Sequence, residues 1–118
     1  MKSIKVVELL STPCLLAPEK GTSLLSEIQN SIKSSPSVVV DFTGYEFLSS
    51  AFLNHAFGQI CIDQGWDTDK FHKKVKTKGL DEDDVDELEL AIDNVQTRRS
   101  LIKQGINPEQ YYASRLPA

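Results

Sequence analysis

Two kinds of hydrophobic spacing mark the predicted elements in the first third of the chain. Residues 3–10 (SIKVVELL) are rich in β-branched and apolar side chains and predict a strand. Pro13 interrupts this run, and the short apolar run 14–17 (CLLA) predicts a second strand, which forms a hairpin with the first. From Ser23 onward, apolar residues recur every three or four positions, which predicts a helix capped by Thr22 or Ser23.

The middle of the chain holds the most apolar segments. Residues 38–42 (VVVDF) form a continuous apolar run closed by an acidic residue, which is typical of a central strand in a sheet. After a turn at 43–47 (TGYEF), a wide apolar stripe predicts a helix that stops at Gly65. Residues 63–69 (DQGWDTD) predict a loop. The stripe consists of Phe52, Leu53, Ala56, Phe57, Ile60 and Cys61.

The last part of the chain predicts one exposed strand and one long helix. Residues 70–80 alternate imperfectly between lysines and apolar residues, as an edge strand does. Residues 81–105 begin acidic and end basic, as the helix dipole favours, and Gly105 suits a helix stop. Asn107 and Pro108 then suit the start of a short C-terminal helix. The expected buried face of the long helix is Val85, Leu88, Ile92, Val95 and Ile102.

The order of these elements is β-β-α-β-α-β-α, followed by a short C-terminal helix or tail. Strands that alternate with helices predict an α/β fold, here a mixed, mostly parallel sheet of about four strands with helices packed on it. A chain of 118 residues is long enough for one domain with its own core. We expect that domain to span residues 1–105, with residues 106–118 as a tail.

Composition excludes several classes of partner. A net charge of −4 and a pI near 5.1 disfavour binding to a nucleic-acid backbone, which normally requires a basic face. No apolar run approaches the roughly 18 residues of a membrane span. Cys14 and Cys61 are far apart and belong to no motif, so we expect free thiols and a cytoplasmic location. We therefore expect neither nucleic acid nor membrane as a partner.

Candidate catalytic and metal-binding groups are few. The acidic run 81–89 lacks the glycine and the ligand spacing of an EF-hand, and the helix dipole already accounts for it. His55 and His72 have no second ligand at metal spacing, and His55 is too far along the helix to act as a base for Ser50. The sequence contains no nucleophile elbow, phosphate-binding loop or dinucleotide motif. We expect no enzymatic activity, no metal and no cofactor.

Ser49 and Ser50 leave two interpretations open. Serine is a favoured helix N-cap, because its oxygen accepts a hydrogen bond from an unpaired N–H of the first turn. A hydroxyl just beyond the end of a central strand also lies where α/β sheets tend to place binding sites. A phosphate carried there would meet free N–H groups and the positive end of the helix dipole. Capping alone and a modified binding loop both fit the sequence.

Residues 37–60 (SVVVDFTGYEFLSSAFLNHAFGQI) resemble the core motif of STAS domains, the anti-sigma-factor-antagonist family. They resemble more closely the STAS-like domains of unknown function found in bacteria and phages. The shared features are an apolar strand ending in Asp-Phe, a turn with glycine, serines and then an apolar helix. The resemblance implies the STAS fold over roughly residues 3–104, in agreement with the element order.

In antagonists of that family, a loop reading Asp-Ser-Ser/Thr-Gly precedes the helix. Its first serine is phosphorylated by a partner kinase that is also the anti-sigma factor. Ser50 matches the phosphorylated serine, whereas Ser49 replaces the acidic residue and Phe52 the glycine. The resemblance thus implies a regulatory module that docks a histidine-kinase-like ATPase, with Ser50 as phosphoacceptor. The implied docking residues are Tyr45, Ser49, Ser50, Phe52, Asn54, His55 and Gln59.

Two other hypotheses use different surfaces. A phage or mobile-element protein could modulate a host protein through the acidic run 81–89 or through Tyr111 and Tyr112. A self-associating domain could form a homodimer through the edge strand at 70–78.

Overall fold

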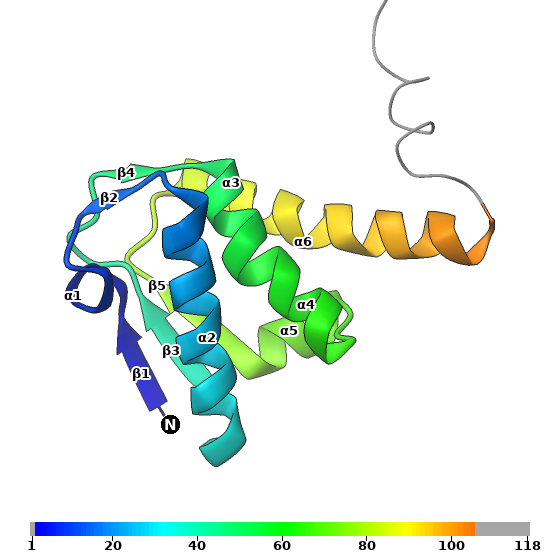
Figure 1. Ribbon diagram of the computed structural model, residues 1–118, viewed down its shortest axis with the longest axis horizontal. Coiled ribbons are helices and arrows are strands. Elements are labelled where there is room, and N and C mark those ends of the chain that lie inside the picture. Colours follow the sequence, from blue (N-terminus) through cyan, green and yellow to red (C-terminus); the bar gives the residue numbers. More distant parts are fainter. Residues whose placement is uncertain (1, 106–118) are drawn as a thin grey trace, which may run out of the picture.

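A three-stranded parallel sheet in the order β1-β3-β5 organises the computed structural model, which describes residues 2–105 (Figure 1). The strands are β1 (Lys2–Lys5), β3 (Val38–Asp41) and β5 (Val75–Lys78). The register places Ile4 beside Val40 and Val38 beside Val75. The predictions of a central strand at 38–42 and of an edge strand within 70–80 are therefore confirmed.

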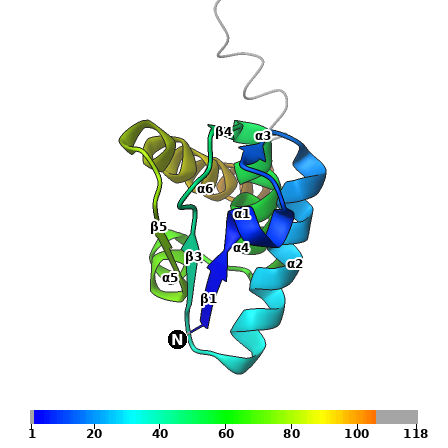
Figure 2. The same ribbon diagram turned by 90° about the vertical axis from the view of Figure 1, so that its left-hand side faces the viewer.

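The helices pack against one face of this sheet. Figure 2 looks onto the sheet, with α4 and α6 behind it, α2 along one side and the short helix α1 in front at the end of β1. The alternation along β3 agrees: Val38 and Val40 are fully buried, whereas Val39 and Asp41 are only partly covered. The helical elements are α1 (Val6–Leu10), α2 (Pro18–Ser34), α3 (Ser50–Leu53), the π-helical turn η1 (Asn54–Gly58), α4 (Gln59–Gln64), α5 (Thr68–Lys74) and α6 (Glu82–Lys103).

Aromatic side chains fill the space between the sheet and the helices. Phe57 lies at the centre, with ring centroids 6.0 Å from Phe42 and 5.8 Å from Phe71. Phe71 also contacts Trp66, and Phe52 is fully buried in the same core. Because α3, η1 and α4 form one continuous helix over residues 50–64, its predicted apolar stripe is confirmed as the inner face. We call this segment the central helix.

The first predicted strand is half right. β1 ends at Lys5, and residues 6–10 form the short helix α1. Val6 and Leu10 lie one helical turn apart, and both are buried. Their burial on one helical face outweighs the β-branched composition of this run, because strand propensity depends strongly on tertiary context. Ser11, in the left-handed region with φ 57°, ends the helix.

The predicted hairpin is wrong. β1 pairs with β3, and β2 (Cys14–Leu15) pairs separately with β4 (Phe47–Leu48); both pairings are parallel. The short helix α1 separates the two segments, so a tight hairpin turn cannot join them. Within residues 2–105 the strands therefore form a three-stranded and a two-stranded parallel sheet, and no mixed four-stranded sheet.

Helix α2 begins five residues earlier than predicted, at Pro18. Proline suits the first helical position because its ring fixes φ and its missing N–H has no partner there. Thr22 and Ser23 lie inside the helix, where their hydroxyls donate to the Pro18 and Glu19 carbonyls. A Cβ added at Gly21 would lie 2.6 Å from the Phe52 carbonyl oxygen, so glycine permits the close packing of α2 on the central helix.

Helix α5 was missed, because residues 63–69 predicted a loop and residues 70–80 a strand. Asp67 caps this helix by accepting a hydrogen bond of 2.7 Å from the Lys70 N–H. Phe71 is the one buried residue of this helix, and Val75 directly after it is the buried first residue of β5. The strand is thereby confined to residues 75–78.

Helix α6 is confirmed, with Gly105 just beyond its end. Leu88, Ile92 and Val95 join the core as predicted. Val85 and Ile102 do not: their side chains are 39% and 63% exposed. Val85 lies outside the buried stripe, and Ile102 lies near the end of α6, which extends beyond the other helices (Figure 1). The predicted C-terminal helix and Tyr111–Tyr112 lie outside the described residues.

The turn between β5 and α6 generates the first prediction. Gly79 and Gly44 both have positive φ, 84° and 92°. A Cβ at Gly79 would lie 2.6 Å from the Thr43 backbone nitrogen, whereas Gly44 has no neighbour within 4 Å. Alanine at either site would carry left-handed strain of about 1–2 kcal/mol. Because only Gly79 also has a close neighbour, Gly79→Ala should lower the free energy of unfolding, measured with urea, clearly more than Gly44→Ala does. Equal losses would contradict the close approach at Thr43.

Candidate functional site

Ser49 caps the central helix, as one of the two interpretations predicts. Its Oγ accepts a hydrogen bond from the Phe52 N–H at 3.1 Å and donates to the Leu16 carbonyl at 2.9 Å. Its own N–H donates to the Leu15 carbonyl at 3.0 Å, beyond the β2–β4 pairing. Ser49 therefore joins the residues after β2 to the first turn of the helix, and its hydroxyl is fully engaged in this role.

Ser50 is the first residue of the helix and is exposed. Its Oγ donates to Glu87 Oε2 on α6 at 2.9 Å. A small pocket of about 300 Å³ surrounds it, which we call the serine pocket. Negative charge dominates this pocket, so a phosphate on Ser50 would face repulsion from nearby carboxylates. The lining residues are Leu48, Ser49, Ser50, Leu53, Asp83, Asp84 and Glu87.

Tyr45 connects the loop after β3 to the start of α6. Its hydroxyl donates to the Asp84 carboxylate and accepts a hydrogen bond from the Asp81 N–H at 3.0 Å. Its ring packs edge-on against Phe42. Burial, together with the nearby carboxylates, raises the pKa of the Tyr45 phenol to about 12. Most of the polar capacity of Tyr45 is therefore used inside the molecule.

Phe52, the fourth implied docking residue of the loop, has no exposed side-chain surface. It is fully buried in the core beneath the central helix. In this conformation Phe52 cannot contact a partner, and it contributes to docking only by positioning the helix. The periodicity of the apolar stripe already placed it on the inner face.

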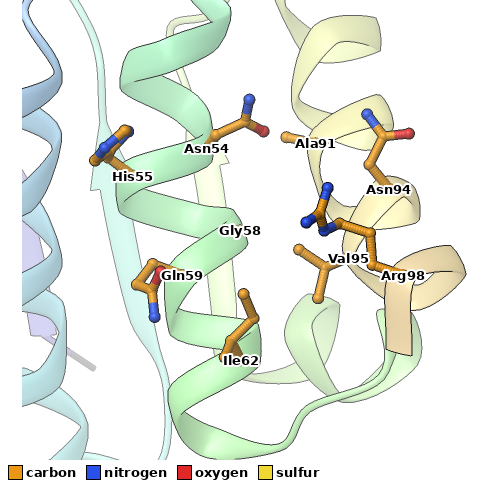
Figure 3. Close-up of a pocket in the computed structure, with 9 residues that line it drawn as sticks. All are labelled: Asn54, His55, Gly58, Gln59, Ile62, Ala91, Asn94, Val95 and Arg98. Atoms are coloured by element: carbon orange, nitrogen blue, oxygen red, sulfur yellow. The ribbon is translucent and has the colours of Figure 1, made fainter. Parts of the chain in front are cut away.

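A larger depression lies between the central helix and α6 (Figure 3), and we call it the groove. Its volume is about 570 Å³. Asn54, Gly58 and Ile62 line one side, and Ala91 and Val95 lie across from them on α6. The complete lining is Asn54, His55, Gly58, Gln59, Ile62, Ala91, Asn94, Val95 and Arg98.

Three of the implied docking residues thus line the groove, and two others line the serine pocket. Figure 3 shows Asn54 directed toward α6, whereas His55 and Gln59 lie on the other side of the central helix. Gln59 donates to Asp63 at 2.9 Å, and the His55 Nδ1 lies 2.9 Å from the Ala51 carbonyl oxygen. The structure therefore places five of the seven implied docking residues in two adjacent depressions, whereas Tyr45 and Phe52 line neither.

The floor of the groove is apolar and is formed by small side chains. Ala91 and Val95 are buried, and a Cβ added at Gly58 would lie 3.4 Å from Val95 Cγ2. Gly58 also ends the π-helical turn η1, a distortion that is frequent at functional sites. Small side chains on an apolar floor with amides at the rim suit the insertion of apolar side chains from another chain.

Sequence reasoning missed the α6 side of the groove. Asn94 and Arg98 are exposed at a spacing of four, next to the buried Ala91 and Val95. The helical periodicity of α6 could have grouped them, but only the structure shows which helix lies opposite. The same holds for Glu87, the partner of Ser50.

The other histidine and the two cysteines show no arrangement typical of a catalytic site among the described residues. His72 Nε2 lies 3.0 Å from a Glu89 carboxylate oxygen, which links α5 to α6. Cys14 is exposed and Cys61 is buried, and both are free thiols. Burial raises the pKa of the Cys61 thiol to about 11, which disfavours its reactive thiolate form. Among residues 2–105, no cluster of three metal-ligating side chains is present.

A family model described as a STAS-like domain of unknown function (DUF4325) matches residues 20–85. This range includes most of α2, the loop with both serines, the central helix and the start of α6. The chain belongs to this STAS-like family. The resemblance of residues 37–60 is thereby confirmed at the level of the family.

The other comparisons add no relatives to the STAS-like family match. Neither the comparison with curated proteins nor the comparison with solved structures finds a match. Within the part of the chain that the structure describes, no helix is both long and apolar enough to cross a membrane.

The Tyr45 contacts generate a prediction about alkaline stability. Removing a hydrogen bond to a charged group costs about 1.5–3 kcal/mol, so Tyr45→Phe should lower the free energy of unfolding at pH 7. The phenol pKa is raised from 10.0 to about 12 by folding, so this contribution is complete below pH 10 and disappears as pH rises toward 12. Urea unfolding between pH 7 and 11.5 should therefore show the wild type and Tyr45→Phe converging above pH 10.

Phe47→Leu is the control, because Phe47 is an exposed aromatic residue without an ionisable hydroxyl. It should keep the pH dependence of the wild type over the whole range. A constant difference between the wild type and Tyr45→Phe up to pH 11.5 would contradict the raised pKa.

Proposed function

We propose that this STAS-like chain is a non-enzymatic regulatory module that binds a protein partner through the groove between the central helix and α6. The observation that carries the proposal is the apolar floor of the groove within an otherwise polar rim. Among the residues that the family resemblance implies for docking, Asn54 points toward α6 across this groove, and His55 and Gln59 border it from the opposite side of the central helix. The serine pocket lies at the N-terminal end of the same helix.

The chemistry of the groove favours an apolar side chain or a short amphipathic helix as the docked group. Ile62 is 52% exposed at the edge of the floor, and its burial by a partner would release apolar surface from water. The amides of Asn54 and Asn94 can pair with polar groups at the rim of such an interface. By resemblance, the partner class that we propose is a histidine-kinase-like ATPase.

Phosphorylation of Ser50 is the proposed switch. The hydroxyl is exposed, and in the unmodified chain it donates to Glu87. A phosphate ester has no such donor and carries a charge of about −1.5 to −2 at neutral pH. Repulsion from Asp83, Asp84 and Glu87 would then push the first turns of α6 away from the central helix. Because α6 forms one side of the groove, the shape of the docking surface would change.

The docking surface is tested with a purified histidine-kinase-like ATPase whose gene neighbours that of this chain. Ile62→Asp places a charge at the apolar floor and should weaken binding, measured by calorimetry, at least about tenfold. Leu9→Asp is the matched control, because Leu9 is 41% exposed on α1, away from the groove. Equal weakening in both variants would reject the groove, and no binding by the wild type would reject this partner class.

The switch is tested by intact-mass measurement after incubation with the same ATPase and ATP. The wild type should gain the mass of one phosphoryl group, transferred from the γ-phosphate of ATP to the Ser50 oxygen. Ser49→Ala should gain it too, because the Ser49 hydroxyl is occupied by the helix cap. Ser50→Ala should not. A gain that persists in Ser50→Ala, or no gain in the wild type, contradicts the assignment.

A further inference from the structure

A depression separate from the groove and from the serine pocket lies between α2, the end of α4 and α5. Its volume is about 620 Å³, and it shares no lining residue with the other two depressions. Lysines, two amides and a tryptophan make up its polar lining, and we call it the lysine pocket. These residues are Gln29 and Lys33 of α2, Gln64 of α4, Trp66, and Lys70 and Lys74 of α5.

Positive charge is concentrated in the lysine pocket, although the whole chain has a net charge of −4. Lys33, Lys70 and Lys74 line the pocket, and no carboxylate does. Among the described residues, none of these three ammonium groups forms an ion pair. The pocket is therefore a place where the local potential favours an anion, in contrast to the rest of this acidic chain.

The carboxylates of the surrounding segment are engaged elsewhere or lie outside the pocket. Asp63 accepts hydrogen bonds from the side chains of two glutamines, one of them Gln29 at 3.0 Å. Asp67 accepts a hydrogen bond from the Lys70 N–H as the cap of α5. Asp69 lies in the first turn of α5 and does not line the pocket. None of these three acids neutralises the lysines by direct contact.

The helix dipoles account for only part of the lysine cluster. Lys33 lies in the last turn of α2 and Lys74 in the last turn of α5, where a base suits the negative end of the dipole. Lys70 lies in the first turn of α5, where a base is unfavourable, and one helical turn from Lys74, whose like charge repels it. This placement lowers stability, as residues of a binding site often do.

Trp66 provides a second, independent observation. It is only 7% exposed, and its ring packs against Phe71. The Trp66 carbonyl accepts hydrogen bonds from Gln96 and Arg99, but its indole N–H has no acceptor among residues 2–105. A buried indole N–H usually has a hydrogen-bond partner. Because Trp66 lines the lysine pocket, an oxygen atom of a ligand bound there can accept this hydrogen bond.

We propose that the lysine pocket binds a small anion that carries a chain of two or three phosphoryl groups. Three ammonium groups match the several negative charges of such a chain, whereas a single phosphate or carboxylate would leave lysines unpaired. The lysines, the indole and the Gln64 amide are donors, and phosphate oxygens are acceptors. The volume of about 620 Å³ falls within the usual range for small-molecule sites. This inference does not depend on the proposed function, because the groove and the lysine pocket share no residue.

The only tryptophan of the chain reports binding directly. Its indole N–H gives a single resonance in a ¹H–¹⁵N correlation spectrum of the full chain. Sodium tripolyphosphate, added at constant ionic strength, should shift this resonance until the site is saturated. Sulfate should bind at least about tenfold more weakly, because one dianion cannot contact all three lysines. The absence of a saturable shift with tripolyphosphate would overturn the proposal, and equal affinity for sulfate would reject the polyphosphate class.

Charge-removing variants test the position of the site. Lys70→Gln and Lys74→Gln should each weaken tripolyphosphate binding at least about fivefold, because each removes a charge-assisted hydrogen bond. Lys73→Gln is the matched control, since Lys73 is an exposed lysine of the same helix that does not line the pocket. Circular dichroism confirms that each variant is folded. Equal weakening by Lys73→Gln would indicate attraction to the overall charge alone and would overturn the site.

Discussion

The burial of Phe57 between Phe42 and Phe71 is the contact on which the rest of the structure depends. It joins the central strand β3, the central helix and α5 in one aromatic layer. Full burial of a phenylalanine stabilises a fold by about 1.5–3 kcal/mol, and four are fully buried here. Once Phe52 and Phe57 direct the inner face of the central helix toward the sheet, its outer face must lie toward solvent. The residues on that outer face are therefore the ones available for binding.

The central helix is flanked by α2 and α6, and the groove lies on the α6 side. On one side, Gly21 lets α2 pack directly against the Phe52 carbonyl. On the other side, α6 reaches the helix through the small residues Ala91 and Gly58, and then extends beyond it. The small residues on the α6 flank leave the groove between α6 and the central helix. The asymmetry follows from where the chain carries glycine and alanine.

The loop before the central helix is fixed at several points. Thr43 donates two hydrogen bonds to Asp41, and these bonds, more than the nearby Lys78, lower the pKa of the Asp41 carboxyl. Tyr45 then ties the loop to α6, and Ser49 ties it to the residues after β2. The serine pocket is therefore lined by two segments far apart in the sequence, 48–53 and 83–87, and the residues after β2 hold Ser49 in place.

Sequence patterns predicted the parts of the fold in which one periodicity dominates. The continuous run at 38–42, the stripe of the central helix and the charge gradient of α6 each led to the correct element. The patterns failed at residues 6–10 and 68–74, where a helix of only one or two turns carries two buried residues (Val6 and Leu10) or one (Phe71). They also failed for the pairing of β1 and β2, because no local pattern records which distant strand lies beside which. Ser49 as a cap was predictable; Glu87 as the partner of Ser50 was not, since 37 residues separate them.

The carboxylates around Ser50 can be compared with the acidic residue in the loop of the antagonist family. In the antagonists that this chain resembles, an acidic residue precedes the phosphorylated serine, and here Ser49 occupies that position. Negative charge is nonetheless present near Ser50, since Asp83, Asp84 and Glu87 of α6 line the serine pocket. In the antagonists, the acidic residue belongs to the same loop as the serine. In this chain, the carboxylates belong to α6, a separate element that forms one side of the groove. In the proposed switch, a phosphate on Ser50 would therefore act on α6, which also forms one side of the groove.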